Sequence, residues 1–263
     1  MKKPVIKKIT QYTFAAGVFA VTTFGVLPST GHRANNSIAI NKSAVSSRAM
    51  LYDNLALDSM GLSRTAFNYA IQGMEKLEAE GKLANTDLIT IVDFSLASNK
   101  KRLFVIDLKN GKVLFNTLVS HGRNSGTDIA TAFSNSPESF KSSLGFYVTG
   151  DTYRGEHGYS LRLAGQEQGI NDNAMSRGIV MHSASYVNEK LAALQGYIGR
   201  SLGCPAIPEK VHRAIIERIK DGSCLFLYSP DKYYMAHSKI LESLPVPLPV
   251  TLPVSLPEDT TIA

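Results

Sequence analysis

The 263-residue sequence contains no tryptophan and only two cysteines, Cys204 and Cys224. Two cysteines allow a single disulfide, which excludes the small disulfide-rich scaffolds that many secreted proteins use. The sequence also lacks His-x-His and His-Glu-x-x-His, the close ligand spacings that are typical of metal-dependent peptidases. We therefore expect a site that uses no metal and no cofactor.

The sequence also has little net positive charge outside its N-terminal segment. The chain has 28 Lys and Arg against 22 Asp and Glu, a net charge of +6. Four of the lysines, Lys2, Lys3, Lys7 and Lys8, lie at the very start, and without residues 1–31 the net charge falls to about +2. The basic character therefore belongs to the N-terminal segment, and we expect no nucleic-acid partner.

Beyond this segment the sequence has no long apolar run. The N-terminal lysines precede sixteen largely apolar residues, from Tyr12 to Leu27, and then Pro28 and small residues. This order is typical of a secretory signal. The run is shorter than the ~20 apolar residues of a spanning helix. We expect a signal peptide over residues 1–31 and an exported chain in the periplasm or cell wall, with no stable membrane span after cleavage. An uncleaved anchor is the alternative.

The rest of the chain predicts one main domain with appendages. Residues 32–85 form a polar lead and a small helical appendage, in which Ser63 caps a helix that ends near Gly81. Residues 86–236 form a mainly β domain with a few helices. Residues 237–263 form a proline-rich tail, whose Leu-Pro-Val repeats are typical of an extended or disordered spacer.

Apolar strand-like runs recur through the main domain, and Asn110-Gly111 is a strong hairpin signal between two of them. We expect a functional role for the long loop over residues 122–143. Helices are expected over residues 187–195 and 208–220. The expected strands cover residues 88–94, 103–108, 112–120, 145–150, 160–165, 178–183 and 223–229.

Cys204 is the candidate nucleophile because it lies between Gly203 and Pro205, which bend the chain tightly. A cysteine needs a base, a helix N-terminus or a cation to become a thiolate. His182 ends an apolar strand and is the candidate base, with Ser201 to orient its ring. Arg200 is a nearby cation, and a helix is expected to start at Pro208. The N–H groups of Gly203 and Cys204 are candidate oxyanion donors.

Three other readings remain open from the residues alone. Cys204 and Cys224 form a structural disulfide in a non-catalytic wall-binding module. The three histidines His121, His157 and His182 hold a metal in a peptidase. A papain-like peptidase is the third, although such enzymes place the cysteine before the histidine in the chain, which is the reverse of the order here.

Residues from about 87 to 228 resemble the catalytic domain of L,D-transpeptidases, and most closely the murein L,D-transpeptidase catalytic domain family. The resemblance is carried by "MHSASYV", which contains His182, and by "GRSLGCPA", which contains Ser201, Gly203 and Cys204. Two flanking segments, "LVSHGRNSG" and "SSLGFYVTG", also match. The chain departs from the wider family pattern at Leu202, which replaces a second histidine, at Ala206, and in its longer His-to-Cys spacer.

The resemblance implies a transpeptidase that acts on peptidoglycan stem peptides through a thioester on Cys204, without a cofactor. It also implies acylation by β-lactams of the carbapenem type. Water in place of the acceptor amine would make the same site an L,D-carboxypeptidase. We expect Arg200, His121 and Arg123 to contact the substrate, and the loop residue His157 to be solvated.

Overall fold

The computed structural model describes residues 48–242. The expected signal peptide and the repeats of the tail lie outside these residues. The first residues assigned to the tail lie within the described range. His237 is the last residue of helix α5 (Lys232–His237), and residues 239–242 form helix α6 (Lys239–Glu242). Within residues 48–242, no helix is both long enough and apolar enough to cross a membrane.

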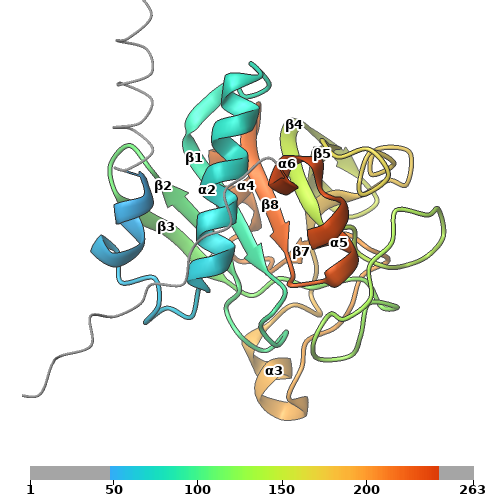
Figure 1. Ribbon diagram of the computed structural model, residues 1–263. Coiled ribbons are helices and arrows are strands. Elements are labelled where there is room, and N and C mark those ends of the chain that lie inside the picture. The colour runs from blue at the N-terminus through green and yellow to red at the C-terminus, as the bar shows by residue number, and fades with distance from the viewer. Residues whose placement is uncertain (1–47, 243–263) are drawn as a thin grey trace, which may run out of the picture.

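The fold is built on one sheet of eight strands in the order β3-β2-β1-β8-β4-β5-β6-β7 (Figure 1). The mainly β fold with a few helices is thus confirmed. The strands are β1 (Asn85–Asp93), β2 (Leu103–Asp107), β3 (Lys112–Thr117), β4 (Gly145–Gly155), β5 (Gly158–Gly165), β6 (Val180–Ser183), β7 (Ala206–Ile207) and β8 (Ser223–Tyr228).

The most deeply buried strands lie at the middle of the sheet. Every residue of β2 and β8 is buried, as are the last six residues of β1. The pairs β1–β8 and β6–β7 are parallel, and the other neighbouring pairs are antiparallel. A strand that is buried on both faces reads as a continuous apolar run, which is why these segments were recognisable in the sequence.

Helix α2 (Arg64–Ala79) lies against one face of the sheet (Figure 1). As expected, Ser63 caps it, and the Ser63 hydroxyl oxygen accepts the Ala66 N–H at 3.0 Å. The helix approaches the sheet closely because Gly73 has no side chain, and a Cβ there would lie 2.0 Å from Cζ of Phe146. The helix expected in an appendage therefore packs as a layer of the main hydrophobic core.

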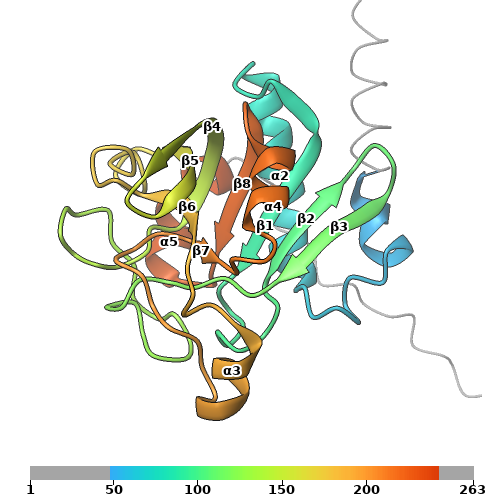
Figure 2. The same ribbon diagram turned by 180° about the vertical axis from the view of Figure 1, so that it is seen from behind.

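Helix α4 (His212–Ile219) covers the opposite face, as the view from behind shows (Figure 2). Its buried residues are Ile215, Ile216 and Ile219. The sequence predicted that this helix starts at Pro208, but Pro208 and a turn come first, and the helix begins four residues later. The remaining helices are α3 (Glu189–Gln195), α5 (Lys232–His237) and α6 (Lys239–Glu242).

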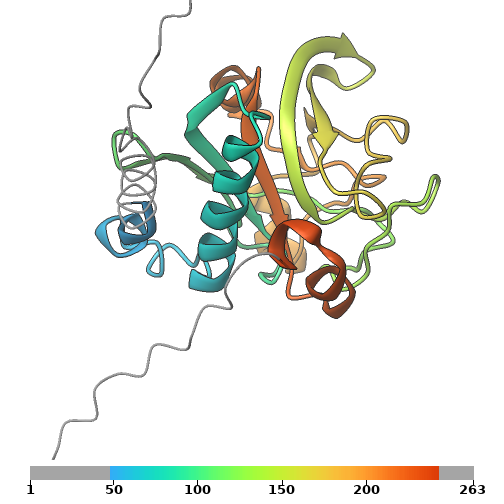
Figure 3. The same ribbon diagram turned by 45° about the horizontal axis from the view of Figure 1, so that its top comes forward.

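Strands β4 and β5 form a long hairpin that bends strongly along its length (Figure 3). The register between them shifts between Thr149 and Thr152, and such irregularities bend a strand and increase its twist. The hairpin closes at Gly155 and Gly158, which pair across the turn. Only Glu156 and His157 lie between these two glycines, so the bend of the hairpin determines the position of His157.

Candidate active site

Cys204 lies in a tight turn immediately before β7. Gly203 in this turn has φ +128°, a conformation that side chains with a Cβ rarely adopt. A Cβ on Gly203 would also lie 2.9 Å from the carbonyl oxygen of Lys141. The glycine is therefore required both by its backbone angle and by the close approach of the 122–143 loop.

Ser201 holds this turn together. Its hydroxyl accepts the Gly203 N–H at 3.0 Å and donates to the Cys204 carbonyl at 2.7 Å. The hydroxyl is fully engaged in the turn, so Ser201 does not orient the His182 ring as we had expected. The Gly203 N–H is also occupied by this bond, so of the two expected oxyanion donors only the Cys204 N–H remains.

The Cys204 sulfur lies against the start of β6. The Val180 N–H donates to Sγ at 3.5 Å, and the Gly178 carbonyl lies 3.6 Å from it. Cys204 is partly buried, whereas Cys224 is fully buried in the middle of β8, and both are free thiols. The disulfide on which the wall-binding alternative depended is therefore absent.

His182 lies on β6, two residues beyond Val180, and pairs with Ala206 on the parallel strand β7. Because side chains alternate along a strand, Val180 and His182 project to the same face. The His182 ring is 3% exposed, and its Nδ1 lies 2.8 Å from the Ser183 carbonyl. Only a protonated Nδ1 can donate to that carbonyl, so in the neutral ring Nε2 is free to accept a proton.

His157 stacks on His182, and this contact was missed at the level of sequence. The two ring centroids are 4.3 Å apart and the planes are inclined by 20°. His157 is exposed to solvent but not isolated in it, because one face of its ring covers His182. The sequence indicated only a solvated loop around His157, and nothing in it indicated where that loop lies.

Arg177 is the cation whose charge acts on the Cys204 sulfur, and no motif in the sequence indicated this role. Its guanidinium donates to the loop at Ser134 O (2.8 Å), Ser139 Oγ (3.1 Å), Lys141 O (2.8 Å) and Ser143 Oγ. The long loop expected to be functional is thus tied to the chain just before β6.

The pKa values of the candidate pair shift in opposite directions. Burial raises the pKa of the Cys204 thiol, and the Val180 N–H and the Arg177 charge oppose this shift. Burial lowers the pKa of His182, the Ser183 carbonyl opposes this, and the charge of His157 lowers the pKa further. Both shifts favour the neutral forms of the two groups, the thiol of Cys204 and the imidazole of His182.

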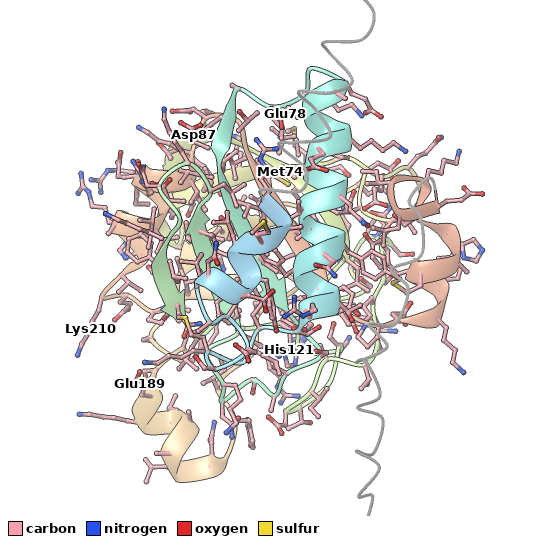
Figure 4. The ribbon with its side chains drawn as sticks, turned by 60° about the vertical axis from the view of Figure 1, so that its left-hand side comes forward. Met74, Glu78, Asp87, His121, Glu189 and Lys210 are labelled. Atoms are coloured by element: carbon pink, nitrogen blue, oxygen red, sulfur yellow. The ribbon has the colours of Figure 1, made fainter. Side chains whose placement is uncertain are left out.

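His121 is placed differently from the expectation of a substrate contact. It is fully buried, with Arg102 Nη2 2.7 Å from its Nδ1 and the Gly126 carbonyl 3.1 Å from its Nε2. Burial and the Arg102 charge lower the pKa of His121 to about 4. Both ring nitrogens are used inside the protein, so His121 supports the loop and offers no atom to a ligand. Figure 4 labels His121 near the N-terminal end of α2.

Arg200 and Arg123 lie together on the surface, although Arg123 is in the 122–143 loop and Arg200 is in the segment that leads to Cys204. Arg200 Nη1 lies 3.4 Å from the Arg123 carbonyl and 3.3 Å from the Gly126 carbonyl. The Arg123 guanidinium lies over the Phe140 ring at 4.1 Å. Both arginines are exposed and available to a ligand, but Arg177 takes the place of Arg200 as the cation that acts on Cys204.

Two clefts lie at opposite ends of β6. One of about 220 Å³ lies beside Gly178 and Val180 and is also lined by Tyr153, Arg162 and Met175. The other, of about 520 Å³, lies beyond Ala184 and Pro208 and has a mixed rim of charged residues. Glu189 and Lys210 of this rim lie on the same side of the molecule (Figure 4).

A family model for the L,D-transpeptidase catalytic domain matches residues 58–228, which is more than half of the chain. This chain belongs to the L,D-transpeptidase catalytic domain family. The matched range includes α2, in agreement with the place of this helix in the core. The search of curated proteins found no match.

Parts of this chain are also similar to solved structures of L,D-transpeptidases, at low sequence identity. An L,D-transpeptidase from Mycobacterium smegmatis is 14% identical, with 54% of this chain and 59% of that chain covered and a TM-score of 0.35. An L,D-transpeptidase in complex with imipenem is 16% identical, covering 54% and 59%, with a TM-score of 0.34. The helical cell shape determining protein Pgp2 from Campylobacter jejuni is 16% identical, covering 61% and 57%, with a TM-score of 0.39. The chain spans less than two thirds of the length of each.

Within this L,D-transpeptidase catalytic domain, the departures from the expected motif are now located. Leu202 is 57% exposed and points away from the core. Ala206 is fully buried at the start of β7, opposite His182 in the register. Among residues 48–242, no group of three or more histidine, cysteine, aspartate or glutamate side chains is arranged to hold a metal ion.

Proposed function

We propose that this protein is a cysteine-dependent L,D-transpeptidase that acts on peptidoglycan stem peptides outside the cytoplasm. The observation that carries the proposal is the position of one free thiol. Cys204 lies in a turn that requires glycine, and its sulfur contacts the Val180 N–H of β6. His182 lies two residues after Val180 on the same strand, and its Nε2 is free to take a proton. Family membership supplies the class of substrate.

In the proposed reaction, His182 Nε2 takes the proton from Cys204 Sγ as the sulfur attacks the carbonyl carbon of a donor stem peptide. That carbonyl belongs to an L-centre joined by an amide to a D-residue. The resulting oxyanion accepts a hydrogen bond from the Cys204 N–H. When the intermediate collapses, the amide C–N bond breaks, the leaving amine takes the proton from His182, and a thioester remains on Cys204.

The second half returns the enzyme to its starting state. His182 takes a proton from the amine of an acceptor stem as this amine attacks the thioester carbonyl. The C–S bond breaks, and the Cys204 sulfur regains a proton from His182. The cleaved amide supplies the free energy of the new amide, so no nucleotide is needed.

The direct test uses purified protein, defined disaccharide-tetrapeptide muropeptides and mass spectrometry of the products. We expect crosslinked products with release of D-alanine from the wild-type enzyme. Cys204→Ala should reduce the rate by at least about 10³-fold, as is usual when a covalent nucleophile is removed. Cys224→Ala is the matched control and should retain activity, because that thiol is buried in β8.

The products also distinguish the two reactions that this site could carry out, transpeptidation and carboxypeptidation. Trimmed stems without crosslinks would assign an L,D-carboxypeptidase, in which water resolves the thioester. Unchanged stems with wild-type protein would contradict catalysis on this substrate. Intact-mass measurement with a carbapenem provides a second readout, and we expect a covalent adduct on wild-type and Cys224→Ala proteins only. An adduct that persists on Cys204→Ala would contradict the assignment of the nucleophile.

A further inference from the structure

We propose that His157 is a positioning residue for His182, which holds the ring of the base and keeps it in its neutral form. The proposal rests on the proposed function only in that His182 acts as the base for Cys204. It assigns a role to the tip of the β4–β5 hairpin, a segment far from the Gly-Cys-Pro turn in sequence.

The geometry of the stack is specific. The centroids of the two imidazole rings are 4.3 Å apart and their planes are 20° from parallel, a distance at which two rings are in direct face contact. His157 comes from a turn of only two residues between Gly155 and Gly158, so its backbone has little freedom to move the ring away. The tip is exposed, whereas His182 beneath it is 3% exposed.

Two independent contacts therefore fix the His182 ring. The Ser183 carbonyl, 2.8 Å from Nδ1, fixes one edge of the ring. The His157 ring fixes one face. Rotation of the His182 ring out of its present plane, about its Cβ–Cγ bond, would break both contacts at once. Without His157, the edge contact alone remains, and the direction in which Nε2 points is less well determined.

The same contact acts on the protonation state. Two stacked imidazoles resist a second positive charge, because like charges at this distance repel. Around His182, the elements that pack against β6 carry several titratable or charged groups. These are His157 on the hairpin, Cys204 before β7, Tyr159 and Arg162 on β5, and His212, Arg213, Glu217 and Arg218 on α4. Of these, His157 is the one whose charge lowers the pKa of His182, in addition to burial.

The stack also shields the base from water. The His157 ring covers one face of the His182 ring, which solvent would reach if His157 were absent. Removal of His157 therefore weakens both causes of the lowered His182 pKa, the burial of the ring and the nearby charge. We expect the His182 pKa to rise in His157→Ala. The base would then become protonated at a higher pH, and its ring would be less well directed.

The test is the pH dependence of Cys204 alkylation by iodoacetamide, followed by peptide mass spectrometry. This readout needs no peptidoglycan. We expect His157→Ala to react about tenfold more slowly at pH 7, a part of the 10²–10⁴-fold that a general base contributes. The acid limb of its profile should move to higher pH. His157→Phe keeps a stacked ring and should recover most of the rate. Glu156→Ala, at the same hairpin tip, is the matched control and should behave as wild type.

The outcomes separate this proposal from the proposed function. A wild-type rate and pH profile in His157→Ala would overturn the positioning role, and so would a His157→Phe protein as slow as the alanine variant. If His182→Ala leaves the alkylation profile unchanged, there is no base to position and the proposal fails. If these profiles change as expected but muropeptides are not converted, the proposed function fails and the role of His157 stands.

Discussion

Acid should destabilise this fold through one buried imidazole, that of His121. The ring has no exposed surface, and its Nδ1 lies 2.7 Å from the guanidinium of Arg102. Arg102 is itself fully buried, and its guanidinium donates to the carbonyls of Leu96 and Val119. Protonation of His121 would place two cations in contact inside the protein, with no carboxylate among the bonds of the pair. The fold therefore resists this proton strongly.

The magnitude follows from the shift. The pKa of His121 is lowered from 6.5 to about 4, first by burial and then by the Arg102 charge. Between these values the unfolded chain binds a proton that the folded protein does not. The stabilisation is thus fully present above pH 6.5 and is lost as the pH falls through about 4. Converted at about 1.4 kcal/mol for each pH unit, the loss is about 3 kcal/mol.

Urea unfolding of wild-type and His121→Gln proteins, at intervals from pH 7 to pH 4, measures the pH-dependent contribution of His121 to the unfolding free energy. The glutamine amide retains one acceptor for Arg102 and one donor for Gly126, but it does not titrate. Taking the difference between the two proteins cancels the opposite contribution of Glu75, whose pKa is raised by burial to about 7. His212→Gln, which replaces a half-buried histidine on α4, is the matched control.

We expect the difference in unfolding free energy between wild type and His121→Gln to change by about 3 kcal/mol across this range. Two curves that stay parallel within about 0.5 kcal/mol would refute the reasoning, because a buried ring with an ordinary pKa produces no such change. A large change in the His212→Gln control would show instead that the effect is not specific to the buried site.

Three further substitutions test the turn and its surroundings. Arg177→Met removes the hydrogen bonds that tie the long loop, and we expect a loss of about 2–4 kcal/mol in unfolding free energy and slower Cys204 alkylation; a variant with wild-type values for both would count against this role. Gly203→Ala should cost about 1–3 kcal/mol through its φ of +128° and abolish Cys204 alkylation, measured by thermal melting and mass spectrometry. Cys224→Ala should cost about 1–3 kcal/mol through lost burial but leave the alkylation rate unchanged, and a slower rate would show that the two thiols are coupled.

Strands β1, β2 and β8 were predictable from the sequence because they are buried almost throughout. Runs such as residues 88–94 and 223–229 have no polar face to obscure the pattern, and they appear as β1 and β8. The layer formed by α2 was not predictable as part of the core. Its apolar face was visible, but the surface that it covers depends on Gly73 fitting against Phe146, a contact between residues far apart in the chain.

The site was predictable only where its residues are close together in sequence. The Gly203-Cys204-Pro205 turn could be recognised from three adjacent residues, and His182 from its place at the end of a strand. Arg177 and His157 could not, because both reach the site from other segments. The role given to Ser201 failed for a related reason: its hydroxyl is satisfied within its own turn, two and three residues away, before it can reach the imidazole.

The opposite pKa shifts at Cys204 and His182 bear on how the thiol is activated. Burial makes the thiolate and the imidazolium both unfavourable, so the resting pair is neutral and the thiol is not reactive in advance. In the proposed reaction, the proton therefore moves as the sulfur meets a carbonyl, and the negative charge passes to an oxyanion near the Cys204 N–H instead of remaining on sulfur. Arg177 and the Val180 N–H partly offset the cost of burial at the sulfur, because both oppose the rise in the pKa of Cys204.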